Sequence, residues 1–248
     1  MTHHIKCSEI WGGIQGDQLE VTTCGIRASL FSRANEGGKG GDIYYLSVCG
    51  SDLLTRIALA DVAGHGESVA NTSQWLYDHL ESHMNSGDGS QILTHLNQQV
   101  LECGYKAITT AVLASFYRSD QNLYFSYAGH HPLLMSQKGT STWTAVLGEE
   151  KEGLSNLPLG VDEETQFVQN SIPLKAGDRL LLYTDGLTEA PNRTGEEFGE
   201  SRLRTALEHS AEKDIDGIRN TIMDELLSHT SGSLNHDDVT LMVTEILD

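Results

Sequence analysis

Aspartate closes an apolar run at four widely separated places in this chain, each time beside glycine or a second acid. The four segments are Gly40–Asp42, Ala60–Gly66, Tyr183–Gly186 and His236–Thr240. Strands that end in this way bring carboxylates to a shared site, where like charges repel one another unless cations lie between them. Mg²⁺ and Mn²⁺ favour such oxygen ligands. The pattern therefore predicts an acidic metal centre assembled from distant parts of the chain.

The apolar run after Asp42 and the one before Asp61 are predicted to pair with each other. These runs, over 43–48 and 53–59, flank the turn-forming residues 49–52, a spacing typical of a β-hairpin. Asp42 and Asp61 stand at the outer ends of this hairpin. Because the first and last residues of an antiparallel pair lie beside each other, the sequence predicts that the two carboxylates are neighbours.

Alternating and helical periodicities divide the rest of the chain into strands and helices. We expect further strands over 20–32, 107–117, 121–128, 133–136, 142–147, 167–172, 179–183 and 238–246. We expect helices over 67–84, 92–101, 198–209 and 213–228. Strands joined mostly by hairpins, with helices inserted in pairs, favour an α+β fold with antiparallel sheets. We assign residues 20–248 to one domain, preceded by an extension of residues 1–19.

Charge and composition exclude several classes of function. The chain carries 35 acids against 16 bases, a net charge of −19, so neither nucleic acid nor an anionic membrane surface is an expected partner. No apolar run approaches the ~20 residues of a membrane helix, and the N-terminus lacks the apolar core of a secretory signal. Four scattered cysteines without CxxC spacing favour free thiols in the cytoplasm over a zinc site.

Six motifs follow one another in an order that resembles a known family. They are Gly40–Asp42, Asp61–Gly66, Tyr127–Pro132, Pro158–Gly160, Gly177–Ala190 and Asp237–Thr240. Each motif alone is weak, but their order resembles that of the PPM-type metal-dependent serine/threonine phosphatases. Within that family, the SpoIIE/RsbU/RsbX-like branch is the most similar. The resemblance extends over most of the chain.

The resemblance implies a four-layer αββα sandwich, in which two antiparallel sheets face each other with helix pairs outside. It also implies two Mn²⁺ or Mg²⁺ ions at one edge of the sandwich. Asp61 would bridge the two ions, and the backbone carbonyl of Val62 would bind one of them. Asp42 would hold the second ion, while Asp185 and Asp237 would complete the first.

Four other residues have less direct implied roles. Gly41, Gly186 and Asp238 would support the ligands from behind, and Asp238 could also add a ligand of its own. His65 is the candidate catalytic acid, although eukaryotic relatives place their histidine directly after an Asp-Gly pair. A histidine between two glycines also suits a structural role, in which the ring hydrogen-bonds to backbone.

The activity that the resemblance implies is hydrolysis of phosphoserine or phosphothreonine by a metal-activated water, without a phospho-enzyme. The substrate would be a regulatory protein, such as an anti-anti-sigma (STAS) regulator. Arg33 and Lys39 lie in the region where relatives hold phosphate, but no motif aligns them, so the phosphate clamp is unassigned.

Two other functions stay open from the sequence. One is a pseudophosphatase that binds a phosphoprotein without turnover, and the other is a phosphohydrolase that acts on a small molecule. The loops 35–41 and 148–165 are expected to shape the substrate groove. The acid-rich run 148–152 is expected to disfavour a strongly acidic substrate surface.

Overall fold

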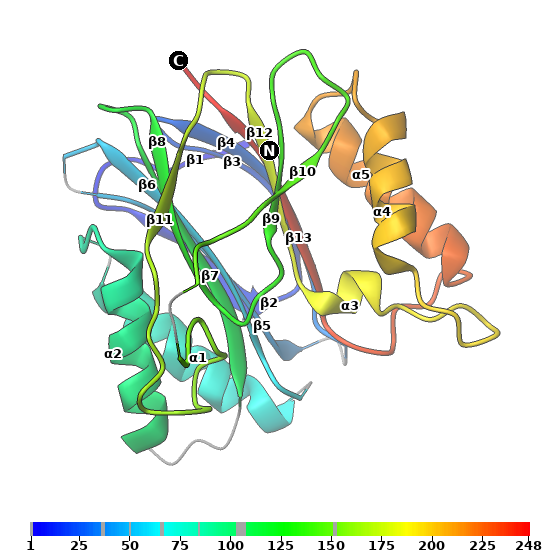
Figure 1. Ribbon diagram of the computed structural model, residues 1–248. Helices are drawn as coiled ribbons and strands as arrows, with labels where there is room; N and C mark the ends of the chain where they lie inside the picture. Colours follow the sequence, from blue (N-terminus) through cyan, green and yellow to red (C-terminus); the bar gives the residue numbers. More distant parts are fainter. Residues whose placement is uncertain are drawn as a thin grey trace.

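Two β-sheets face each other in this chain, and helices cover both outer faces (Figure 1). The computed structural model describes residues 2–35, 38–49, 51–64, 67–83, 85–102, 108–150 and 153–248. Within these ranges the layers follow the order helix, sheet, sheet, helix. The expected αββα sandwich is therefore confirmed.

The larger sheet has seven strands in the order β1-β3-β4-β13-β12-β9-β10. Neighbouring strands in it are antiparallel, except for the parallel pair β1–β3. Its strands are β1 (Thr2–His4), β3 (Asp17–Thr22), β4 (Ile26–Arg33), β9 (Leu133–Ser136), β10 (Thr144–Val146), β12 (Arg179–Tyr183) and β13 (Val239–Ile246). The C-terminal strand thus lies in the middle of the sheet.

The smaller sheet has six antiparallel strands in the order β11-β8-β7-β6-β5-β2. They are β2 (Ile10–Gln15), β5 (Lys39–Val48), β6 (Leu54–Val62), β7 (Thr109–Tyr117), β8 (Asn122–Ala128) and β11 (Asn170–Pro173). The predicted hairpin is present as β5 and β6, and the second predicted hairpin as β7 and β8.

Two groups of helices close the sandwich. Helices α1 (Glu67–Ser82) and α2 (Gly89–Glu102) cover the six-stranded sheet. Helices α3 (Asp185–Thr188), α4 (Gly199–His209) and α5 (Ile215–His229) cover the seven-stranded sheet. The four long helices agree with the predicted ones, whereas the single-turn α3 was not expected.

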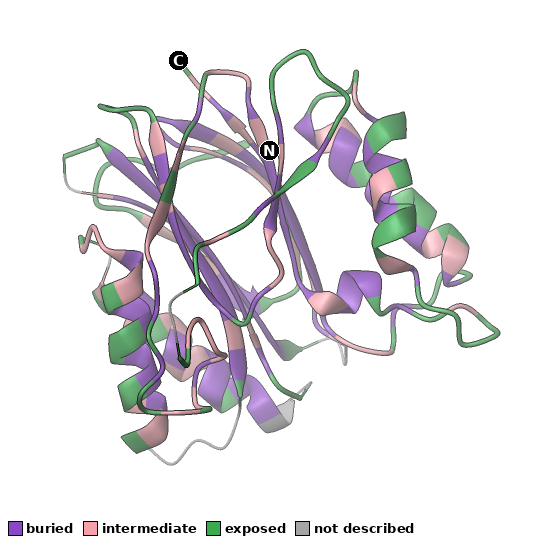
Figure 2. Ribbon diagram, in the orientation of Figure 1, coloured by how far each residue is buried: buried purple, intermediate pink, exposed green. Residues whose placement is uncertain are grey.

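Buried residues lie in three layers, one between the sheets and one between each helix group and the sheet that it covers (Figure 2). Tyr44, Phe125 and Leu182 lie between the sheets, while Leu93 of α2 and Ile222 of α5 face the sheets that their helices cover. Sheets buried on both faces need apolar residues at successive positions rather than in strict alternation. Strand β5 accordingly is buried from residue 40 to residue 48.

The single strand expected over 20–32 is wrong, because this segment contains two strands, β3 and β4, joined by a tight turn. Thr23 makes the turn: its hydroxyl accepts hydrogen bonds from the backbone N–H groups of Gly25 and Ile26, at 3.3 and 3.0 Å. Its own N–H donates to the carbonyl of Ile26 at 2.8 Å. Threonine side chains that bond to nearby backbone in this way favour turns over continued strand.

No periodic signal marks residues 1–19, yet this segment contributes to both sheets. Strand β1 pairs with β3 in the larger sheet, and β2 pairs with β5 in the smaller one. The ring of Trp11 lies 5.3 Å from that of Tyr44, measured between centroids. Gly12 and Gly13, which lie in β2, interrupt the alternation that would have indicated a strand, since glycine is disfavoured in strand interiors.

None of the helices in the described ranges combines the length and the apolarity needed to cross a membrane.

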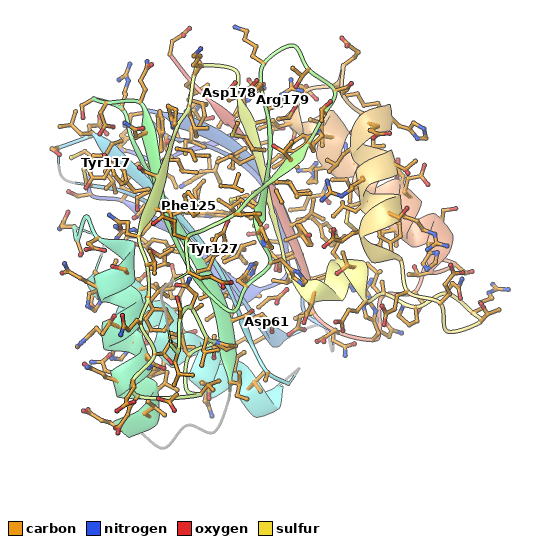
Figure 3. The ribbon with its side chains drawn as sticks, viewed as in Figure 1. Asp61, Tyr117, Phe125, Tyr127, Asp178 and Arg179 are labelled. Carbon is orange, nitrogen blue, oxygen red and sulfur yellow. The ribbon has the colours of Figure 1, made fainter. Side chains whose placement is uncertain are left out.

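A substitution at Phe125 tests how much the packing between the sheets contributes to stability, since this side chain is only 1% exposed (Figure 3). The substitution Phe125→Ala should lower the free energy of unfolding by about 3–5 kcal/mol, because it removes buried apolar surface and leaves a cavity. Urea denaturation followed by circular dichroism measures this. Leu53→Ala, at a side chain 47% exposed, serves as the control and should change stability by less than about 0.5 kcal/mol. A loss below about 1 kcal/mol for Phe125→Ala would contradict the packing described here.

Candidate metal centre

The β5–β6 hairpin places Asp42 and Asp61 directly opposite each other. Asp42 is buried, with 3% of its surface exposed, and Asp61 is partly exposed. Both stand at the open end of the hairpin, far from its turn. Figure 3 shows Asp61 at the end of the sandwich where α3 lies in Figure 1. The neighbouring carboxylates predicted from the sequence are therefore present.

The seven-stranded sheet brings further acids to the same end. Asp185 begins α3 directly after β12, and Asp237 and Asp238 directly precede β13. Because β12 and β13 are antiparallel neighbours, the end of the first lies beside the start of the second. The charges of Asp185 and Asp237 both raise the pKa of Asp61. The four predicted carboxylate ligands thus lie within electrostatic range of one another.

Thr184 joins the two sheets at this point. Its hydroxyl donates a 2.8 Å hydrogen bond to Oδ2 of Asp42 and accepts one of 3.1 Å from the backbone N–H of Thr240. The backbone N–H of Thr184 also donates to the carbonyl of Thr240. This residue was not predicted as part of the site. The only signal in the sequence is its position between an apolar strand and an Asp-Gly pair.

The carboxylate of Asp238 accepts hydrogen bonds from backbone N–H groups and does not face solvent. Its Oδ1 accepts a hydrogen bond from the N–H of Asn35 at 2.6 Å, and its Oδ2 accepts one from the N–H of Gly41 at 2.5 Å. It is 3% exposed. The carboxylate therefore fixes the start of β5 immediately before Asp42, a role in keeping with the supporting position that the sequence suggested.

Glycine is required at two positions because backbone atoms approach them closely. A Cβ atom at Gly41 would lie 2.6 Å from the carbonyl oxygen of Val62, and one at Gly186 would overlap the carbonyl oxygen of Asp238. The carbonyl of Gly186 also accepts a 2.7 Å hydrogen bond from Nε2 of His236. Any side chain at Gly41 or Gly186 would thus push the carboxylate-bearing segments apart.

Burial and mutual repulsion oppose ionisation of the two hairpin aspartates. Burial is the largest cause that raises the pKa of Asp42, to about 8, with the hydroxyls of Thr240 and Thr184 opposing it and the charges of Asp238 and Asp185 adding to it. Burial also raises the pKa of Asp61, to about 9, with Asp42 as the next largest cause. A cation placed between these groups would reverse both effects.

The donor set fits a hard divalent cation, because it consists of carboxylate oxygens that burial leaves without compensating charge. The described ranges contain no three His, Cys, Asp or Glu side chains already arranged to hold a metal ion. Asp42 and Asp238 also accept hydrogen bonds from protein groups, which hold their carboxylates at this end of the sandwich.

The motifs 127–132 and 158–160 pack against each other beside the carboxylates. Gly129 has a left-handed backbone, with φ of +65°, and a Cβ atom there would overlap the ring of Pro158. Leu159 exchanges two backbone hydrogen bonds with Thr109, which pairs with Val62 at the end of β6. These two motifs thus shape the chain next to the candidate metal centre.

One histidine and two basic residues near the site contact other side chains as follows. The ring of His131 stacks on that of Tyr183, with centroids 5.4 Å apart. The guanidinium of Arg33 donates to Asn235 at 3.4 Å, and the ammonium of Lys39 donates to Gln74 at 3.2 Å. His65, the candidate catalytic acid, lies outside the described residues. The phosphate clamp stays unassigned.

Solved structures share this fold over most of the chain. The RsbU and RsbW domains of Rv1364c from Mycobacterium tuberculosis give a TM-score of 0.75 at 24% identity, covering 94% of this chain and 63% of that one. The PP2C phosphatase domain of SpoIIE from Bacillus subtilis gives a TM-score of 0.74 at 24% identity, covering 90% and 62%. The fold is therefore that of the PP2C phosphatases, a metal-dependent class that corresponds to the PPM type.

The sequence assigns the chain to one family within this class. Residues 51–247 match the family of Stage II sporulation protein E (SpoIIE), and the chain belongs to this family. The phosphoserine phosphatase RsbU of Bacillus subtilis (strain 168) is 28% identical over 232 residues, which cover 92% of this chain and 64% of RsbU. The chain thus spans less than two thirds of the length of RsbU. The resemblance found in the motifs is confirmed.

Thr184→Val removes the hydroxyl that orients Asp42 and keeps the shape of the side chain. We expect the affinity for Mn²⁺ to fall by about tenfold, since groups that orient a ligand typically contribute about 10–100-fold. Isothermal titration calorimetry measures the affinity. Thr205→Val, on the exposed face of α4, is the matched control, and equal affinities for the two variants would refute the orienting role of Thr184.

The raised pKa values predict how pH changes stability when divalent cations are removed. In the unfolded chain the aspartates titrate near 3.8, whereas Asp42 and Asp61 in the folded chain keep their protons to about 8 and about 9. The free energy of unfolding should therefore be highest below about pH 3.8, where the folded and the unfolded chain both hold these protons. It should fall as pH rises, by about 1.4 kcal/mol per pH unit for each proton that the folded chain keeps and the unfolded chain has lost. Urea denaturation in EDTA from about pH 5 to pH 8 measures the slope. Saturating Mg²⁺ should reduce it, and a stability that rises with pH in EDTA would contradict the assignment.

Proposed function

We propose that this chain is a metal-dependent protein phosphatase that hydrolyses phosphoserine or phosphothreonine on a regulatory protein. The observation that carries the proposal is the convergence of Asp42 and Asp61 from one sheet with Asp185 and Asp237 from the other. Membership of the SpoIIE family and similarity to a phosphoserine phosphatase support the same activity.

The residues that would hold the cations are Asp42, Asp61, Asp185, Asp237 and the carbonyl of Val62. When bound, divalent cations of the Mn²⁺ or Mg²⁺ type, two in our proposal, supply an activated water and positive charge for the phosphoryl oxygens. The protein's own groups preorganise this site. Thr184 orients the carboxylate of Asp42, while the hydrogen bonds from Asn35 and Gly41 to Asp238 fix the approach of β5.

A thiol nucleophile is not supported by the described cysteines. Cys49 lies at the turn of the β5–β6 hairpin, opposite the end that carries Asp42 and Asp61. Cys24 contacts the carbonyl of Asp52 at the same turn, and burial raises the pKa of its thiol. A thiol must ionise to act as a nucleophile, so Cys24 is poorly suited. Free thiols at these positions accord with a cytoplasmic location, which we also propose.

The substrate that we propose is a phosphorylated regulatory protein, with a STAS-type regulator as the first one to test. RsbU, which the chain resembles over most of its length, is a phosphoserine phosphatase. The net charge of −19 disfavours nucleic acid as a partner.

Hydrolysis of p-nitrophenyl phosphate tests the proposed chemistry. The unmodified chain should turn over this substrate with Mn²⁺ or Mg²⁺ and not with EDTA. Asp61→Asn should lower turnover by more than about 100-fold, since loss of a group that merely orients a ligand already costs about 10–100-fold.

Asp224→Asn, on the exposed face of α5, is the matched control and should keep full turnover. Circular dichroism verifies that both variants fold. Turnover that persists in EDTA, or in Asp61→Asn, would refute the metal-dependent mechanism. Absence of turnover with every metal would favour a binding protein without catalysis.

A further inference from the structure

Most of the large apolar side chains that reach solvent belong to one segment of the described chain or lie against it. In the described ranges five of them are prominently exposed: Leu53, Ile108, Leu147, Leu154 and Val161. Three of the five belong to the segment between β10 and β11. Ile108 lies against this segment, because its neighbour Thr109 pairs with Leu159. We call Ile108, Leu147, Leu154 and Val161 the rim residues. Single exposed apolar side chains are ordinary, but a local concentration of them indicates an interaction site.

One of the rim residues, Ile108, borders the candidate metal centre. The N–H of Ala63, two residues after Asp61, donates a 2.8 Å hydrogen bond to the carbonyl of Ile108. Leu159 exchanges hydrogen bonds with Thr109 on strand β7, and the next residue, Thr110, pairs with Asp61. In Figure 1 the segment between β10 and β11 runs from β10 down beside α2. A molecule seated on the rim residues that reaches Ile108 would therefore lie next to Asp61.

Side-chain hydrogen bonds fix the described residues of this segment on both sides of positions 151–152. Asn156 donates to the carbonyl of Glu149 at 3.2 Å and accepts from the N–H of Val168 at 3.0 Å, and its carbonyl accepts from Gly129 at 2.7 Å. The amide of Asn97 on α2 accepts from Gly160 and donates to Asp162. A surface fixed before binding loses less entropy when a partner docks on it.

Leu147 lies between two cavities. It is 74% exposed, the most exposed of the rim residues. A cavity of about 360 Å³ on one side is lined by Tyr127, His130 and Pro132, among others. A cavity of about 340 Å³ on the other side is lined by Phe125, Ile172 and four polar residues, Glu149, Gln169, Asn170 and Ser171. Leu147 lines both cavities, and each of them is also lined by one acid, Glu150 in the first and Glu149 in the second. Each cavity is large enough to accept a side chain of a partner.

The charge around the rim residues is negative. Residues 147–164 contain Lys151 as their only base, against six acids: Glu149, Glu150, Glu152, Asp162, Glu163 and Glu164. Glu149, Glu150, Glu163 and Glu164 are exposed. Acidic residues beside an apolar surface attract a basic partner and repel an acidic one.

We propose that the rim residues and the acids beside them form a docking surface for the phosphorylated protein, and that it selects substrates with basic and apolar residues beside the phosphoserine. This inference rests on the proposed phosphatase function and specifies its substrate class. The apolar side chains of the substrate pack on the rim residues, and its lysine or arginine residues face Glu149 and Glu150, which line the cavities flanking Leu147. The phosphoserine then reaches the carboxylate end of the sandwich.

Two phosphoserine peptides of equal length test the selection, one with lysine, arginine and leucine around the phosphoserine, the other with glutamate and serine at those positions. The unmodified chain should hydrolyse the basic peptide with a kcat/KM about tenfold higher, mainly through KM, because charge complementarity of this kind governs partner choice. The double substitution Glu149→Lys and Glu150→Lys should abolish or invert this preference. Leu147→Ser should raise KM for the basic peptide several-fold. Turnover of p-nitrophenyl phosphate should not change in either variant.

Matched substitutions elsewhere on the surface provide the controls. The pair Asp224→Lys and Glu225→Lys on the exposed face of α5 makes the same change of charge far from the rim residues. Leu53→Ser removes an exposed leucine at the turn of the β5–β6 hairpin. Neither control should alter the preference between the peptides. An equal effect of Asp224→Lys with Glu225→Lys would mean that net charge alone selects the substrate, and would overturn the proposal.

Binding measured without turnover separates this inference from the proposed function. Fluorescence anisotropy with Asp61→Asn should show tighter binding of the basic peptide and loss of that difference when Glu149→Lys and Glu150→Lys are added. Turnover of p-nitrophenyl phosphate without peptide preference would overturn the docking surface and leave the phosphatase intact. Peptide preference in binding without any turnover would refute the phosphatase function and retain the surface.

Discussion

One buried and one partly exposed aspartate, Asp42 and Asp61, face each other at the end of a hairpin, and contacts from both sheets hold them there. Burying one carboxylate already costs free energy, and placing a second beside it adds repulsion. Asp42 and Asp61 are nevertheless kept side by side, because the register of the β5–β6 pair places them opposite each other on adjacent strands. Thr184 then reaches across from the other sheet to bond with Asp42. The strain of like charges at this position is what gives the molecule its affinity for divalent cations in our proposal.

The arrangement depends equally on close backbone contacts. Gly41 lies against the carbonyl of Val62, and Gly186 lies against that of Asp238. Each glycine adjoins an aspartate of the site. Strands that meet at such short range can deliver side chains into a small volume, which bulkier residues would prevent. The Gly-Asp and Asp-Gly pairs of the sequence are therefore a packing requirement as well as a chemical signature.

The sequence predicts those parts of the site that follow from local pairing. The pairing of Asp42 with Asp61 was predictable because a turn between two apolar runs fixes the register of a hairpin. The periodicities predicted an α+β fold with antiparallel sheets, and the resemblance implied its four layers. The role of Thr184 could not be predicted, since it depends on how two sheets dock. For the same reason, the turn at Thr23 and the strands within residues 1–19 were missed: side-chain capping and glycine hide the periodic signal there.

Strand β13 is the last strand of the chain and yet lies between β4 and β12 in the middle of its sheet. During synthesis the chain emerges from its N-terminus, so β4 and β12 are available before the strand that must separate them. The pairing of Thr184 with Thr240, and the support that Asp238 gives to β5, arise only when that strand is inserted. A nascent chain can therefore form the hairpin early but acquires the assembled carboxylate cluster only after β13 has been synthesised. Such long-range closure is slow compared with local pairing, and it keeps a polypeptide that still lacks β13 from presenting the finished site.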